Sequence, residues 1–254
     1  MYKADFEATA ESGLAKMNFF KTNPKGYFIS SMLAGAYIGF GSLLTNTIGG
    51  VLDGAPATKV VTGVAFSVAL SLVIMAGAEL FTGNNLAMAA GIYRKKLKLA
   101  DAIRLLIACW LGNLAGSWIL CLLFHFSGLN TGATATYLAN LAATKMHIPF
   151  VQLLIRGILC NMLVCLAIWC CTRAKSDAGK LIMVFWCILA FFTTGFEHSI
   201  ANMTQLSAAL LDPSGAAVSV GGYFYNLLTV TAGNIIGGVV FVAVPYYICQ
   251  EKDA

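Results

Sequence analysis

Charged side chains are scarce in this chain. Only 11% of its 254 residues are Asp, Glu, Lys or Arg, whereas 59% are hydrophobic and the mean hydropathy is +0.78. A soluble domain carries about 25% charged residues, so the composition indicates an all-α integral membrane protein. The net charge of +5 is not arranged as a basic stripe interleaved with aromatics on a soluble domain, and we therefore expect no nucleic-acid partner.

A paired-cysteine motif is also missing. None of the eight cysteines stands in C-x-x-C spacing, and all lie within or at the ends of apolar stretches: Cys109, Cys121, Cys160, Cys165, Cys170, Cys171, Cys187 and Cys249. The pattern predicts reduced, buried thiols, with no redox pair, metal site or cofactor. A membrane thiol oxidoreductase is the enzyme hypothesis that so many cysteines suggest, and the missing motif argues against it.

The apolar stretches predict six membrane-spanning regions in a single domain over residues 1–254. They run approximately from Tyr27 to Val51, Val60 to Tyr93, Ile103 to Phe126, Val151 to Cys171, Leu181 to Leu211 and Tyr223 to Ile248. The first 26 residues lack the continuous apolar core of a signal peptide. Their spacing of apolar residues predicts an amphipathic helix that lies in the membrane interface, or else one used in subunit packing.

Two of the six regions are too long for one straight helix. Val60 to Tyr93 holds 34 residues, which would reach roughly 51 Å against a hydrocarbon core of about 30 Å. The stretch from Leu181 to Leu211 has the same difficulty, and each of the two contains a glutamate beside glycine, Glu79 or Glu197. We therefore predict a helix break near each glutamate, where unwound backbone must be covered by protein or line a wet cavity.

Lysine and arginine predict the orientation of the chain, because they concentrate in cytoplasmic loops. They cluster before the first span and after the second and fourth, which places both termini in the cytoplasm. The opposite side has few cations, namely Lys59, Lys145 and Arg156, and these require a separate explanation.

The two halves of the chain resemble each other. G-N-x-x-G occurs at residues 112–116 and again at 233–237, each time after one of the long spans. We interpret this as a three-plus-three inverted repeat, with repeat one at about 27–127 and repeat two at about 150–249. Such repeats place the permeation route at their interface. Taken singly, each motif indicates close helix packing through small residues.

Longer motifs resemble the formate/nitrite transporter family. They are I-M-A-G-A-E-L-F-T-G at 74–83, G-I-L-C-N-M-L-V-C-L-A at 157–167 and G-F-E-H-S-I-A-N-M at 195–203. The motifs are most similar in sequence to those of nitrite-type members, and hydrosulfide-type members are also close. The resemblance implies an aquaporin-like protomer, a pentamer with one pore per protomer, and conduction of small monovalent anions across a prokaryotic cytoplasmic membrane. The paired Asn-Pro-Ala motifs of aquaporins themselves are absent.

The resemblance places His198 and Asn161 at the centre of the pore, with Thr82 nearby. An imidazole can give a passing anion a hydrogen bond or a proton, and we expect Asn161 to hold the ring by a hydrogen bond. The Thr82 hydroxyl can both donate and accept. Without the resemblance, His198 would be interpreted as a satisfied buried polar group and Asn161 as helix packing.

Further positions match residues that narrow the family's pore or attract the anion. The narrowing residues are Phe66, Leu70, Leu80, Phe81 and Phe191. Core packing is the alternative for these five. Lys145 aligns with a family lysine near the pore and would focus anions at a vestibule; a solvated loop lysine is the alternative.

Glu79 and Glu197 invite a different hypothesis, a cation or proton-coupled transporter that uses both carboxylates directly. For an anion pore a facing carboxylate would repel the permeant. We therefore expect both, together with Asn202, to support the loops, with the carboxylates accepting hydrogen bonds from backbone N–H groups freed by the breaks. The sequence thus predicts an anion channel or carrier without enzymatic activity, whose partners are the anion, the bilayer and its own copies.

Overall fold

The computed structural model describes residues 2–52 and 54–250, so the ends of the predicted domain, at residues 1 and 251–254, lie outside it. The helices are α1 (Lys3–Thr22), α2 (Pro24–Leu52), α3 (Thr58–Ala76), α4 (Phe81–Tyr93), α5 (Leu99–Phe126), α6 (Gly132–Met146), α7 (Phe150–Arg173), α8 (Asp177–Thr194), α9 (Ser199–Leu211), α10 (Val220–Gly238), η1 (Val239–Ala243) and α11 (Val244–Ile248). Six segments of this described part are long and apolar enough to cross a membrane: α2, α3, α5, α7, α8 and the run Val220–Ile248. The prediction of six spans is confirmed.

Both predicted breaks are present. The second span consists of α3 and the 13-residue half helix α4, and the fifth consists of α8 and the 13-residue half helix α9. A glycine ends the first helix of each pair, Gly77 at φ +76° and Gly195 at φ +80°. Such positive φ values are adopted readily only by glycine, so these two residues fix where the spans break.

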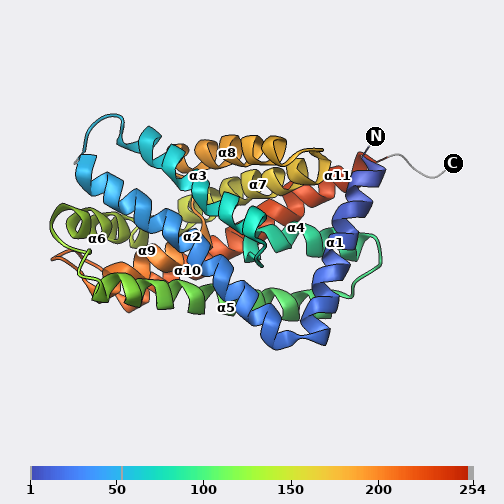
Figure 1. Cartoon of the computed structure of the whole chain (residues 1–254), viewed down its shortest axis with the longest axis horizontal. Coiled ribbons are helices and arrows are strands. Elements are labelled where there is room, and N and C mark those ends of the chain that lie inside the picture. Colours follow the sequence, from blue (N-terminus) through green and yellow to red (C-terminus); the bar gives the residue numbers. More distant parts are fainter. Residues whose placement is uncertain (1, 53, 251–254) are drawn as a thin grey trace.

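Small residues let the long helices approach closely. A Cβ added to Gly35 on α2 would collide with the backbone of Asn113 on α5, and one added to Gly233 on α10 would collide with the backbone of α7 near Leu154. The G-N-x-x-G segments therefore lie at helix contacts, as their small-residue spacing predicts. Figure 1 shows the long helices bundled along one axis, with α1 across one end and α6 at the other.

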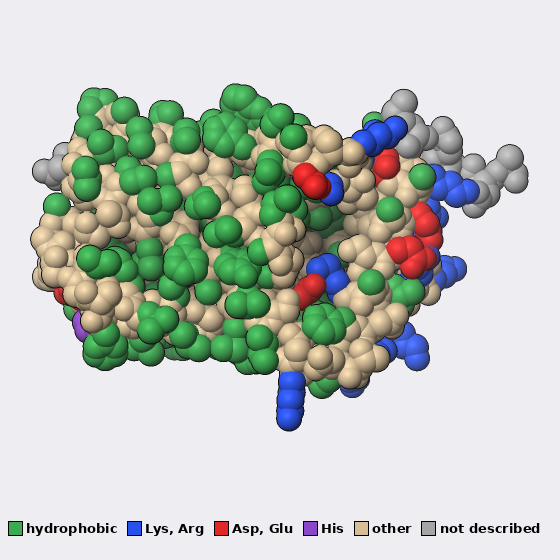
Figure 2. Space-filling model, in the orientation of Figure 1, with side chains coloured by type: hydrophobic (Ala, Val, Ile, Leu, Met, Phe, Trp, Pro, Cys, Tyr) green, Lys and Arg blue, Asp and Glu red, His purple; other side chains and the backbone are tan. Residues whose placement is uncertain are grey.

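The apolar residues of helix α1 pack on the protein itself. Phe6, Ala10, Gly13 and Met17 are buried, with Phe6 and Ala10 in one cluster with Leu86 and Ala89 of α4. Carboxylates on α1 meet cations of the α4–α5 loop and the last residue of α7, where Asp5 lies 2.5 Å from Arg173. In Figure 2 the charged side chains gather toward this end of the molecule, and most of the remaining visible face is hydrophobic or uncharged.

Two further elements were not expected from the sequence. Helix α6 lies between the proposed repeats, in a region of mixed alanine and threonine that gave no strong apolar pattern. The last span contains a π-helical turn, η1, directly before Pro245. Because proline has no N–H to donate to the carbonyl four residues earlier, the widened turn accommodates its ring within a continuous span.

Candidate functional site

The two half helices meet at their N-terminal ends, where His198 touches Thr82. His198 is the N-cap of α9, and its Nδ1 accepts the backbone N–H of Ala201 at 3.1 Å. Its Nε2 lies 3.1 Å from Oγ1 of Thr82, in the first turn of α4. Because Nδ1 accepts a hydrogen bond, the proton of the neutral ring is on Nε2. The imidazole therefore presents an N–H donor to the centre of the molecule.

His198 is buried beneath an aromatic side chain. The residue is 3% exposed, and its ring stacks on that of Phe191 with centroids 5.9 Å apart. Phe66 meets Phe191 edge to face at 5.9 Å. The positive ends of the α4 and α9 dipoles also converge here, which favours a negative charge.

Asn161 does not hold the His198 ring, so that prediction is wrong. Its Nδ2 donates to the carbonyls of Thr82, at 3.3 Å, and Asn234, at 2.6 Å. Its Oδ1 is buried and has no partner within the described residues. Asn161 thus ties the start of α4 to α10, while Thr82 contacts the ring.

Two cavities approach this centre from opposite ends. The first, of about 530 Å³, is lined by Lys16 of α1, Glu79 and Leu80, and is called here the α1 vestibule. The second, of about 310 Å³, is lined by Lys145 of α6, Phe191 and His198, and is called the α6 vestibule. Phe66 and Leu70 are buried in one apolar cluster with Leu80, which lines the first cavity, and Phe191, which lines the second.

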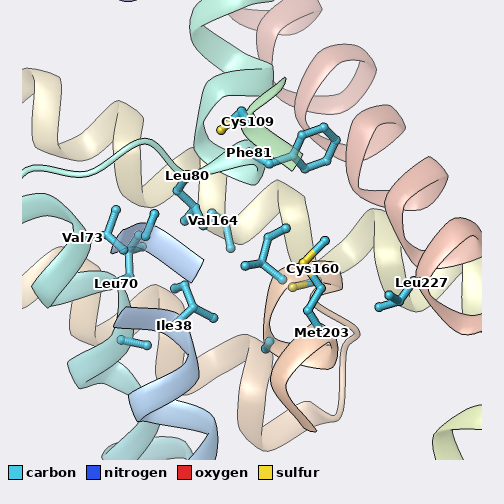
Figure 3. Close-up of a cluster of buried hydrophobic side chains, with 14 of the residues drawn as sticks. Ile38, Leu70, Val73, Leu80, Phe81, Cys109, Cys160, Val164, Met203 and Leu227 are labelled. Atoms are coloured by element: carbon cyan, nitrogen blue, oxygen red, sulfur yellow. The ribbon is translucent and has the colours of Figure 1, made fainter. Parts of the chain in front are cut away.

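The predicted narrowing residues do not all lie along one line. Figure 3 shows Leu80 close to Val164, Leu70 and Val73, whereas the Phe81 ring points away from them toward another group of helices. Phe81 in fact lines a separate apolar groove between α4, α5 and α10, together with Trp110 and Leu106. The geometry therefore favours Leu70, Leu80, Phe66 and Phe191 as narrowing residues and leaves Phe81 on the outer side of α4.

Each break contains a lysine–glutamate–asparagine cluster. Lys145 Nζ lies 2.7 and 2.8 Å from the two carboxylate oxygens of Glu197, and Asn202 Nδ2 donates to the same carboxylate at 2.7 Å. At the other break Lys16 Nζ lies 2.7 Å from Glu79, and Asn84 Nδ2 donates to Glu79 at 2.9 Å. Lys145 is consequently a paired, half-buried lysine and not a solvated loop residue.

The glutamates do not accept the freed backbone N–H groups, and that part of the interpretation is wrong. The N–H of Phe81 donates to Asn113 Oδ1 at 3.0 Å, and the N–H of Ser199 donates to Asn234 Oδ1 at 2.9 Å. Each of these asparagines also donates to the carbonyl of its own glutamate, Asn113 at 2.9 Å and Asn234 at 3.0 Å. Asn113 and Asn234 are therefore the residues that cap the breaks.

The sequence did not point to these two asparagines, because G-N-x-x-G is also a packing motif. The signal was available: a side chain with two donors and an acceptor stands at matched positions in two otherwise apolar spans. Lys16, the counterpart of Lys145, was not predicted either, because α1 was expected in the membrane interface or in subunit packing.

Comparison with known proteins identifies the family. Residues 3–248 match the family model described as Formate/nitrite transporter. The chain is 39% identical over 233 residues to "Nitrite transporter NirC" of Salmonella typhimurium, covering 91% of this chain and 86% of that one. It is 35% identical to "Probable formate transporter" of Methanothermobacter thermautotrophicus, with 89% of both chains covered.

Solved structures are similar along nearly their whole length. An "FNT family ion channel" superimposes with a TM-score of 0.93 at 35% identity, covering 98% of this chain and 99% of that one. A "Pentameric formate channel with formate bound" gives a TM-score of 0.81 at 30% identity, covering 90% and 98%. These relatives bear the names of transporters and channels, not of enzymes. The chain is a multi-pass membrane protein that belongs to the formate/nitrite transporter family.

Proposed function

We propose that this protein passes small monovalent anions of weak acids, such as nitrite, formate or hydrosulfide, between its two vestibules. The observation that carries the proposal is the Nε2–H donor of His198, whose ring is held by the cap bond to Ala201 and stacks on Phe191. An anion that leaves water at an apolar slit needs a compensating donor at the point of greatest dehydration. Nitrite and formate are supported by the names of the relatives, and hydrosulfide by its size and charge.

The geometry favours hydrogen bonding over proton donation at His198. Donating the Nε2 proton from the neutral ring would leave an imidazolate. Donating it from an imidazolium requires a second proton on Nδ1, and that nitrogen already accepts the Ala201 N–H. The anion therefore passes by exchanging water for the N–H of His198 and the hydroxyl of Thr82.

The alternative of a cation or proton-coupled transporter that uses Glu79 and Glu197 has less support. Each carboxylate is occupied by a lysine and an asparagine. Glu79 and Glu197 therefore support the two helix breaks, together with Asn202.

The assembly and orientation belong to the same proposal. We place five copies in a ring with one pore in each, by similarity to the pentameric formate channel. The α1 end, where lysine and arginine concentrate, faces the cytoplasm of a prokaryotic inner membrane, and the α6 vestibule opens outward.

Replacing His198 by asparagine tests the proposal, because it separates the cap from the donor. Asparagine is among the best N-cap residues, so α9 keeps its cap, but its shorter amide no longer reaches Thr82.

We expect initial nitrite and formate flux of His198→Asn into proteoliposomes to fall about 10-fold, which corresponds to the loss of about one hydrogen bond. His147→Gln, at an exposed histidine of the α6 end, is the matched control. Flux that is unchanged in His198→Asn removes His198 from the mechanism, and wild-type flux no higher than in empty liposomes ends the proposal.

A further inference from the structure

The α6 vestibule contains two cations that the clusters at the breaks do not use. Lys59 and Arg156 line this cavity beside Lys145 and Glu197. Within the described part of the chain, neither of the two side chains has a hydrogen-bond or ion-pair partner, whereas Lys145 is neutralised by Glu197. The cavity thus has three cations and one carboxylate on its walls.

The opposite vestibule is different. Its lysines, Lys16 and Lys180, both have carboxylate partners, Glu79 at 2.7 Å and Asp177 at 3.0 Å. The unpaired positive charge that lines the two vestibules is therefore concentrated at the α6 end.

Folding stability does not account for Lys59 and Arg156. Lys59 stands in the first turn of α3 and Arg156 in the second turn of α7. A helix N-terminus carries partial positive charge that falls off within the first turn, so the cation of Lys59 is unfavourable there unless an anion joins it. Arg156 lies beyond this effect, but its side chain has no carboxylate partner within the described residues. Both side chains border a cavity that leads to His198, which is the place where an anion from solvent would meet them.

We propose that Arg156, together with Lys59, forms the anion-recruiting site of the α6 vestibule and that it selects planar anions with two oxygens. This rests on the proposed function and adds a substrate preference to it. A guanidinium donates two parallel N–H bonds to two oxygens on one atom, the arrangement that nitrite and formate share with a carboxylate. Hydrosulfide has a single sulfur and gains only the attraction of the charge. Lys59 supplies a point charge that raises the local concentration of any anion.

The neutral lining leaves the anion to these two cations. Ser42, Thr45 and Thr62 line the same cavity, but each hydroxyl donates its one O–H to a backbone carbonyl. Arg156 and Lys59, whose side chains have no partner within the described residues, are therefore the groups that meet the anion there.

The test measures initial uptake of nitrite, formate and hydrosulfide into cells whose own carriers for these anions are deleted. Arg156→Lys keeps the positive charge and removes the two parallel N–H donors of the guanidinium. We expect it to raise the half-saturating concentration of nitrite and formate about 5-fold and that of hydrosulfide less than about 2-fold. Lys59→Gln should raise the half-saturating concentrations of all three anions by about 2- to 3-fold. This increase should be smaller at high salt, because salt screens the charge of Lys59. The control is Lys175→Gln, an exposed lysine of the α7–α8 loop at the other end.

The outcomes separate this inference from the proposed function. Wild type and Lys175→Gln should be indistinguishable, and immunoblots should show equal protein in the membrane. If Arg156→Lys does not insert, Arg156→Gln is measured instead, with the same ranking of anions expected. Unchanged nitrite and formate half-saturation, or an equal shift for hydrosulfide, overturns the inference while transport itself persists. Absence of uptake by the wild type overturns the proposed function.

Discussion

The pair formed by Lys145 and Glu197 gives the sharpest prediction, because two explanations of Lys145 lead to opposite results. In the structure Lys145 neutralises a carboxylate, and the exposed fractions of the two side chains are 14% and 4%. Lys145→Met leaves Glu197 charged next to His198. An anion roughly 8 Å from that carboxylate is repelled by about 2 kcal/mol at an effective dielectric constant of about 20. This lowers flux about 30-fold.

The double variant Lys145→Met/Glu197→Gln distinguishes the explanations. It removes both charges, and the glutamine can still accept from Asn202. If Lys145 acts by neutralising Glu197, the double variant regains at least about a third of wild-type flux. If Lys145 acts by attracting anions, the double variant is as impaired as the single one. The assay is initial nitrite flux in proteoliposomes, normalised to inserted protein.

Stability provides an independent measurement of the same pair. Breaking a buried pair by removing one partner costs about 3 kcal/mol when the site is partly wet, as the α6 vestibule is. The double variant should recover most of this loss in reversible unfolding with SDS. The explanation by neutralisation is refuted if Lys145→Met is as stable as the surface variant Lys175→Met. It is also refuted if the nitrite flux of the double variant is as low as that of Lys145→Met.

Two further predictions concern the breaks and α1. Asn234→Ala removes bonds to Ser199 N, Gly157 O and Glu197 O, so it should lower the free energy of unfolding by about 3 kcal/mol, and a loss below about 1 kcal/mol would contradict the capping role. Lys96 lowers the pKa of Glu7 below its ordinary value, so this contact stabilises the docking of α1 fully above about pH 4.3 and loses that contribution as pH falls through the lowered pKa. Hydrogen exchange in α1 should therefore accelerate below pH 4 relative to the intrinsic exchange rate. The acceleration should be smaller in Glu7→Gln, and identical pH profiles for the wild type and this variant would contradict the role of Glu7.

The sequence predicted the features that depend on local pattern and length. Spans that are too long for a bilayer require breaks, and Gly77 and Gly195 mark them because only glycine adopts their φ values readily. His198 was found because its motif resembles that of a family. These inferences do not require knowledge of the tertiary contacts that each residue makes.

Contacts between distant elements were not predictable in this way. Asn113 caps a residue 32 positions earlier, and Lys145 pairs with a glutamate 52 positions later. Periodicity places such residues on a helix face but does not say which groups they meet. For this reason the backbone N–H groups were expected at the glutamates and the His198 ring at Asn161.

The matched clusters suggest longer repeats than the sequence did. Lys16 of α1 and Lys145 of α6 occupy equivalent roles at the two breaks. We therefore propose that α1 belongs to repeat one and α6 to repeat two, so that each repeat comprises a preceding helix and three spans. Leu80 and His198 are then equivalent N-caps, and only the second of them presents a donor to the pore.

Flux under separate anion and cation gradients tests the central claim most directly. Purified protein is placed in liposomes with a nitrite or formate gradient and equal cation concentrations on both sides, and then with a cation gradient and equal anion concentrations. The account predicts anion flux in the first condition, lost about 10-fold in His198→Asn, and no flux in the second. Flux that follows the cation gradient, or wild-type anion flux that equals that of empty liposomes, would contradict it.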